Sequence, residues 1–151
     1  MRVLCDTNIL IRWTEADDPE HGACVEAVDS LLTEGMDVCV CAQVLIEFWA
    51  VSTRPVAANG LGLTSEETHR RVRDFRKTFG ALPEPPNIAE QWLCLATTNH
   101  VMGKQAHDAR LVALMLAHNV TRLLTLNPSD FTRYQEITPV TPHEILQQKS
   151  V

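Results

Sequence analysis

Acidic side chains at widely separated positions are the residues of this chain most able to do chemistry. Asp6, Glu47 and Asp108 lie far apart in the sequence, and Asn127 and Asp130 follow later. Oxygen ligands of this kind bind hard divalent cations such as Mg²⁺ or Mn²⁺. The set therefore indicates a site for a divalent cation, provided that the fold brings the acids together.

The pattern of apolar residues predicts strands that alternate with helices. Short apolar runs indicate buried strands, and apolar residues that recur every three or four positions indicate helices. Strands are predicted at residues 2–5, 38–41, 122–126 and 137–140, and helices at about 9–13, 24–32, 43–53, 64–79, 88–97 and 105–118, with a last helical turn from residue 141. This alternation is typical of an α/β three-layer sandwich, in which helices flank a mostly parallel sheet.

The predicted elements bring the acids to one edge of the sheet. Ligands of open α/β sheets bind beyond the carboxyl ends of the strands, and Asp6 directly follows the first strand. Glu47 lies on the flank of the apolar stripe of its helix, and Asp108 projects from the buried side of its helix. Carboxylates clustered away from water need protons or a cation. We therefore expect a cation among these three acids.

Each acid also has a structural interpretation. Asp6 could cap the helix that begins near Thr7, and Asp108 could complement the dipole of its own helix. Glu47 is the hardest to explain in this way, because neither capping nor solvation accounts for an acid inside the apolar segment 44–51. The case for a functional cluster therefore depends most on Glu47.

Composition places the chain among ordinary globular proteins. It has 151 residues, of which 45% are hydrophobic and 21% are charged, so one compact domain is expected. The sequence contains no apolar run long enough for a signal peptide or a membrane span, and we expect a cytoplasmic protein. A net charge of -6 argues against binding of nucleic acid over the whole surface. Cations would have to mediate such a contact locally.

The five cysteines are scattered and form no C-x-x-C pair. Most of them lie in apolar segments, so we expect reduced thiols in the core. Basic residues gather on the helix after Thr64, where Arg70, Arg73 and Arg76 lie opposite the apolar stripe. They are interpreted first as a solvated helix face, with RNA contact as the alternative.

Four segments that contain these polar residues resemble the motifs of PIN-domain nucleases, and within them the VapC-type toxin ribonucleases of toxin–antitoxin pairs. The similar segments are residues 4–10 (LCDTNIL), 44–48 (VLIEF), 107–113 (HDARLVA) and 124–131 (LTLNPSDF). Each motif is short, but the four stand in the family's order and at its approximate spacing over nearly the full chain. The resemblance implies a single PIN-like nuclease domain over residues 1–151.

By this resemblance, Asp6, Glu47 and Asp108 are metal ligands, directly or through water, and Thr7 steadies the cluster. The family often has a fourth acid in the last motif. Here Asn127 stands at the matching position and Asp130 follows it, so both are candidates, Asn127 as a catalytic residue and Asp130 as a metal ligand. The implied reaction is Mg²⁺- or Mn²⁺-dependent hydrolysis of RNA.

The resemblance also implies partners. A small antitoxin protein would cover an apolar surface that contains Trp13 and Trp49, and could place an arginine among the carboxylates. The chain is expected to form a homodimer. The RNA that it cleaves is not specified by the sequence, because base selection depends on local contacts.

Several other functions are compared with this one. A phosphatase of the haloacid dehalogenase type needs a second acid where Asn8 stands, and a response-regulator receiver needs a lysine near residues 125–127. A noncatalytic PIN-like module that binds RNA or a partner would not need the three intact acids. A DNA nuclease of the same fold stays open.

Overall fold

In the computed structural model, which describes residues 1–150, five strands form one parallel sheet. The strands are β1 (Arg2–Cys5), β2 (Asp37–Cys41), β3 (Gly80–Leu82), β4 (Arg122–Leu124) and β5 (Thr138–Val140). Their order in the sheet is β3-β2-β1-β4-β5, and every neighbouring pair is parallel. The first strand is therefore central, and its carboxyl end lies between those of β2 and β4.

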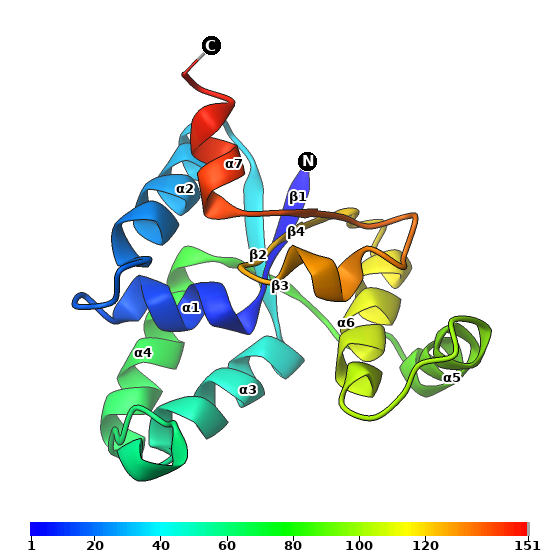
Figure 1. Cartoon of the computed structure of the whole chain (residues 1–151), viewed down its shortest axis with the longest axis horizontal. Coiled ribbons are helices and arrows are strands. Elements are labelled where there is room, and N and C mark those ends of the chain that lie inside the picture. Colours follow the sequence, from blue (N-terminus) through cyan, green and yellow to red (C-terminus); the bar gives the residue numbers. More distant parts are fainter. Residues whose placement is uncertain (151) are drawn as a thin grey trace.

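Helices cover both sides of this sheet (Figure 1). They are α1 (Thr7–Thr14), α2 (His21–Thr33), α3 (Ala42–Thr53), α4 (Ser65–Thr78), α5 (Ile88–Thr98), α6 (Gln105–Ala117) and α7 (Pro142–Gln147), with short 3-10 helices η1 (Val56–Ala58) and η2 (Pro128–Phe131). Helices α1 to α4 and α7 pack together in one group, and α5 packs against α6 in another. The three-layer α/β sandwich expected from the sequence is confirmed.

Local sequence signals account for where several helices begin. Thr64 and Glu67 form a capping box at the start of α4, in which each side chain bonds the backbone amide of the other residue. Thr141 and Glu144 form a second one before α7. Each box satisfies two amides that the first helical turn leaves unpaired. Both helices start where the sequence places them.

The core lies between the sheet and these helices. An aromatic group of Trp13, Phe48, Phe75 and Phe79 joins α1, α3 and α4, with ring centroids 4.8 to 6.3 Å apart. All five cysteines are free thiols, as expected, and four of them are buried. The expectation of a core thiol is wrong for Cys94, which is exposed on α5. No residue of α5 is fully buried, so this helix only partly covers the sheet side.

Two strands differ from the sequence prediction. Strand β3 was not predicted, because Gly80 to Leu82 is too short for a periodic pattern and lacks β-branched residues. Strand β4 ends at Leu124, two residues earlier than predicted. The amide of Leu126 donates to the side chain of Asn8 instead of continuing the strand ladder. The chain thus leaves the sheet at the edge where the acids gather.

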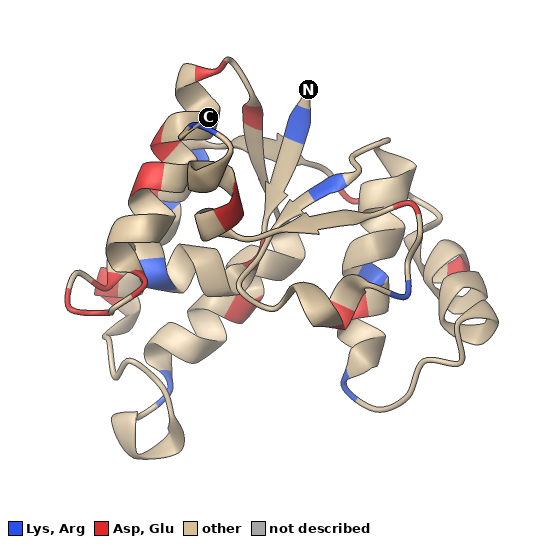
Figure 2. Ribbon diagram, turned by 45° about the horizontal axis from the view of Figure 1, so that its top comes forward, with Lys and Arg blue, Asp and Glu red and all other residues tan. Residues whose placement is uncertain are grey.

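Charged residues are interspersed along the helices and loops (Figure 2). Arg70, Arg73, Arg76 and Lys77 are exposed on α4, as the helical pattern predicts. Within residues 1–150, no helix is both long and apolar enough to cross a membrane.

Candidate active site

Asp6 lies where β1 ends and α1 begins. Its Oδ1 accepts a hydrogen bond of 2.8 Å from the amide of Thr7, so it caps α1 as the structural interpretation expects. Its Oδ2 accepts bonds of 2.7 Å from Thr125 Oγ1 and 3.3 Å from Asn8 Nδ2. These three bonds hold the carboxylate in one orientation and leave about one of its four acceptor positions open.

Asn8 and Thr125 tie the exit of β4 to the exit of β1. Asn8 Nδ2 donates to Thr125 Oγ1 over 3.3 Å, and Asn8 Oδ1 accepts from the amide of Leu126 over 3.1 Å. The Thr125 side chain is fully buried, and its Oγ1 also accepts from the amide of Asn127. A hydroxyl has one donor and two acceptor positions, so all three are used. This interlock fixes where residues 126 and 127 stand relative to Asp6.

Glu47 is held by two side chains. Thr7 Oγ1 donates to its Oε2 over 2.9 Å, and Gln43 Nε2 donates to its Oε1 over 3.1 Å. Thr7 thus contacts Asp6 through its backbone amide and Glu47 through its hydroxyl. Because Thr7 directly follows Asp6, this contact brings the carboxylate of α3 to the end of the central strand.

Asp108 lies in the first turn of α6 and is partly buried. Its pKa is raised to about 6, first by burial and then by the charges of Asp130, Asp6 and Glu47. The pKa of Asp6 is also raised, first by burial and then by Glu47 and Asp130, against the lowering effect of its hydrogen bonds. The charges of Glu47 and Asp130 therefore act on both Asp6 and Asp108.

Asn127 and Asp130 lie at η2, and both are exposed. The amide of Asp130 donates to the carbonyl of Asn127 over 3.2 Å. In the part of the chain that the structure describes, neither side chain makes a hydrogen bond. Its charge acts on both Asp6 and Asp108. Asp130 therefore lies at the exposed edge of the site, where its negative charge acts on the partly buried acids.

The donor set suits a hard cation bound partly through water. None of the ion pairs among residues 1–150 involves Asp6, Glu47, Asp108 or Asp130, so their charges lack a protein counter-ion. Within the same residues, no three His, Cys, Asp or Glu side chains are close enough to hold a metal directly. Mg²⁺ commonly binds through one or two carboxylates and keeps several waters. The arrangement therefore fits such an ion.

One protein family matches most of the chain. The family model described as PIN domain matches residues 3–137. The chain belongs to the PIN domain family. A search of curated protein sequences gave no match.

Solved structures with the same fold include toxin–antitoxin proteins. VapBC2 from Rickettsia felis bound to a promoter DNA fragment has a TM-score of 0.70 and 17% identity, over 93% of this chain and 98% of that chain. A toxin–antitoxin complex from Klebsiella pneumoniae has a TM-score of 0.63 and 22% identity, over 94% and 98%. The sarcin-ricin loop cleaving toxin VapC20 from Mycobacterium tuberculosis has a TM-score of 0.59 and 16% identity, over 80% and 86%.

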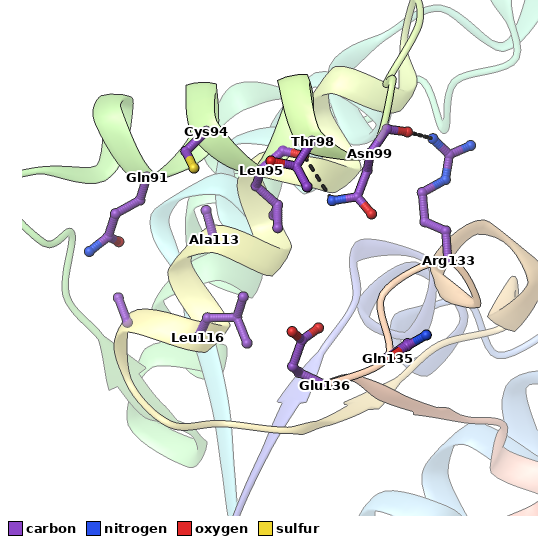
Figure 3. A pocket seen from close by; sticks show the side chains of 11 residues that line it. Gln91, Cys94, Leu95, Thr98, Asn99, Ala113, Leu116, Arg133, Gln135 and Glu136 are labelled. Atoms are coloured by element: carbon purple, nitrogen blue, oxygen red, sulfur yellow. Dashed lines mark hydrogen bonds between the residues drawn. The ribbon is translucent and has the colours of Figure 1, made fainter.

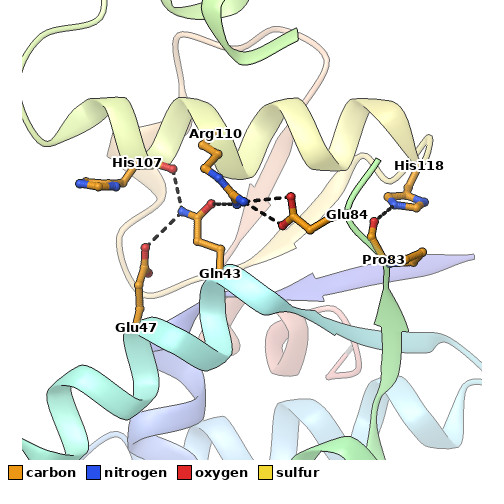
Figure 4. Close-up of polar contacts among 7 residues, drawn as sticks. All are labelled: Gln43, Glu47, Pro83, Glu84, His107, Arg110 and His118. Carbon is orange, nitrogen blue, oxygen red and sulfur yellow. Dashed lines mark hydrogen bonds and ion pairs between the residues drawn. The ribbon is translucent and has the colours of Figure 1, made fainter. Parts of the chain in front are cut away.

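A hydrogen-bond network in this PIN domain connects Glu47 to Gln43, Arg110 and Glu84 (Figure 4), and the sequence did not predict it. Gln43 Oε1 accepts from Arg110 Nη1 over 2.8 Å, and Gln43 Nε2 donates to the carbonyl of His107 over 2.8 Å. Arg110 also donates to both carboxylate oxygens of Glu84, each over 2.9 Å. The available signal was spacing, because residues 43 and 47 are four apart on one helix.

Two cavities of this PIN domain have different relations to the acids. One of about 410 Å³ is lined by Gln43, Ile46, Glu47, His107 and Arg110, so it opens beside a carboxylate of the cluster. Another of about 600 Å³ lies between α5, α6 and residues 133–136 (Figure 3). None of the four clustered acids lines this second cavity. The site is therefore beside the first cavity.

Proposed function

We propose that this PIN domain is an endoribonuclease that depends on Mg²⁺ or Mn²⁺. The observation that carries the proposal is that Thr7 contacts the carboxylates of both Asp6 and Glu47 at the end of the central strand, while no ion pair of the described residues involves Asp6, Glu47, Asp108 or Asp130. Asp6, Glu47 and Asp108 are the metal ligands, directly or through water. Asp130 is a further metal ligand at the rim, and Asn127 is a neutral catalytic residue beside it.

The residues of the chain then hold the candidate metal ligands in fixed orientations. Asp6 presents a carboxylate fixed by Thr7, Asn8 and Thr125, and Glu47 presents one fixed by Thr7 and Gln43. A divalent cation held by these residues would lower the pKa of a water molecule and stabilise negative charge on the phosphoryl oxygens. The exposed rim leaves the site accessible to a nucleic acid strand. Preformed orientation means that little rearrangement is needed before reaction.

RNA is the favoured substrate because one protein of the same fold is described as a sarcin-ricin loop cleaving toxin. The net charge of -6 means that the cation, together with local basic groups, must meet the phosphates. A DNA nuclease of the same fold is the alternative, and a noncatalytic binding module is a second one.

A small antitoxin is the favoured partner, since proteins with this fold occur in toxin–antitoxin complexes. Exposed apolar side chains on α3, Ile46 at 67% and Trp49 at 39%, offer a surface for it near Glu47. Trp13 contributes less to this exposed surface than the sequence analysis expects, because its ring packs on Phe75 and Phe79. A homodimer is proposed as well, and light scattering measures it directly.

The substrate is tested with purified protein, Mn²⁺ and three polymers of matched sequence: RNA, single-stranded DNA and double-stranded DNA. Cleavage of RNA alone is expected. Cleavage of DNA with intact RNA contradicts the ribonuclease assignment, and binding without cleavage of any polymer supports the noncatalytic module.

The toxin assignment is tested in cells. Expression of the wild-type chain should arrest growth, and the Asp6→Asn variant should not. Co-expression with the protein encoded by the adjacent reading frame should restore growth and yield a complex on purification. Harmless wild-type expression without any co-purifying partner contradicts the toxin assignment while leaving the nuclease proposal intact.

A further inference from the structure

The amide group of Gln43 can stand in only one orientation. Arginine has donors and no acceptor, so the atom of Gln43 that meets Arg110 Nη1 at 2.8 Å must be the oxygen. The amide nitrogen then faces Glu47 Oε1 and the carbonyl of His107, and both of its hydrogens are used. Gln43 is itself buried. Arg110 thereby determines that Glu47 meets a hydrogen-bond donor.

Arg110 is fixed in turn by the segment that follows β3 (Figure 4). Its Nη2 lies 2.9 Å from both carboxylate oxygens of Glu84. Glu84 is flanked by Pro83 and Pro85, whose rings fix their own backbone φ angles. A ring nitrogen of His118 lies 2.7 Å from the carbonyl oxygen of Pro83. The anchor for Arg110 is therefore a stiff segment that is also held by His118, the residue directly after α6.

This chain of contacts joins the two helices that carry acids. Gln43 and Glu47 belong to α3, whereas His107 and Arg110 belong to α6 on either side of Asp108. The two bonds that Gln43 makes to α6 hold its first turns against α3. The same amide therefore orients the Glu47 carboxylate while its other bonds anchor it to α6.

We propose that Gln43 is a positioning residue that holds Glu47 in its metal-binding orientation, and that Arg110 and Glu84 act on the site through Gln43. This inference rests on the proposed function, because it assigns Glu47 to the metal. Groups that orient metal ligands typically contribute about 10- to 100-fold to metal affinity or activity. The expected loss of metal affinity is largest for substitution of Gln43, smaller for Arg110 and smallest for the half-exposed Glu84.

The test compares Gln43→Met, Arg110→Met and Glu84→Gln with wild type by calorimetric titration of Mn²⁺ and by thermal unfolding. Gln43→Met keeps the side-chain length. It removes the N–H donors to Glu47 and to the carbonyl of His107, and it removes the oxygen that accepts from Arg110. It should weaken Mn²⁺ binding about tenfold or more, Arg110→Met less, and Glu84→Gln least. The matched control is Gln91→Met on α5, since Gln91 lines the cavity of Figure 3 and its buried Oε1 has no partner in the described residues. This control should leave Mn²⁺ affinity unchanged.

A double-mutant cycle separates positioning from a general loss of stability. In a Glu47→Gln background, Gln43→Met should weaken Mn²⁺ binding no further, because the carboxylate on which it acts is gone. Equal Mn²⁺ affinity of wild type and folded Gln43→Met overturns the positioning proposal. The proposal is also overturned if Gln43→Met lowers Mn²⁺ affinity in the Glu47→Gln background as much as it does in wild type. Wild type that binds no Mn²⁺ overturns the proposed function instead.

Discussion

Thr125 Oγ1 donates a 2.7 Å hydrogen bond to Asp6 Oδ2 across 119 positions of sequence. The same oxygen accepts from Asn8 and from the amide of Asn127. One buried hydroxyl thus links the end of β1, the end of β4 and the approach to η2. The orientation of the first acid depends on a residue that carries no charge.

Replacement of Thr125 by valine removes this hydroxyl at nearly constant volume. Thr125→Val should lower the free energy of unfolding in urea by about 1–3 kcal/mol, because buried polar partners lose their hydrogen bonds. Thr125→Ser should recover most of the loss. Thr138→Val, at an exposed position of β5, is the control and should have little effect. Equal stability of Thr125→Val and wild type contradicts the interlock.

Asp108 should make the stability of the metal-free protein depend on pH. Its pKa is raised from 3.8 to about 6, first by burial and then by Asp130, Asp6 and Glu47. A carboxyl group with a raised pKa binds its proton more tightly in the folded state. Its stabilising contribution is therefore complete below pH 3.8 and is lost as the pH rises through about 6.

Asp108→Asn removes the charge that is unfavourable above this range. With a chelator present, the variant should unfold at higher urea concentration than wild type near pH 8, and the two should converge near pH 4. The exposed Asp29→Asn on α2 provides the control. A variant that is less stable than wild type near pH 8 shows that Asp108 makes net favourable contacts and contradicts the repulsion inferred here.

The acids and the rim residues should differ in how strongly cleavage depends on them. Asp6→Asn, Glu47→Gln and Asp108→Asn should each nearly abolish cleavage, because each changes a carboxylate of the metal site. Asn127→Ala and Asp130→Ala should reduce it less and raise the Mn²⁺ concentration that is needed, since both lie at the exposed rim. Full activity of Asp130→Ala at limiting Mn²⁺ assigns Asp130 to the turn, and the site then depends on three carboxylates.

Much of the fold could be predicted because local signals agree with tertiary packing. The capping boxes at Thr64 and Thr141 begin helices, and the apolar runs of β1 and β2 are buried strands. Strand β3 could not be predicted, because its three residues become a strand only by pairing with β2 at the sheet edge. The end of β4 depends on Asn8, a residue more than a hundred positions away.

The sequence identifies the candidate acids, but it does not identify the residues that hold them in place. Asp6, Glu47 and Asp108 lie at strand ends or on buried helix flanks, which the sequence pattern shows. Arg110 and Glu84 carry opposite charges at 26 residues' separation, and nothing local indicates that they meet. Their contact arises from how α6 packs beside the segment after β3, so it is a property of the fold.

The central claim is tested most directly by incubating purified protein and a structured RNA with Mn²⁺, with and without a chelator. Asp6→Asn is the matched variant, because the asparagine side-chain oxygen still caps α1 while the charge, and the acceptor that Thr125 and Asn8 use, are removed. Wild type should cleave the RNA, and both the chelator and the variant should stop cleavage while the protein stays folded. Cleavage that persists in the chelator and in Asp6→Asn would contradict a metal-dependent reaction at these carboxylates.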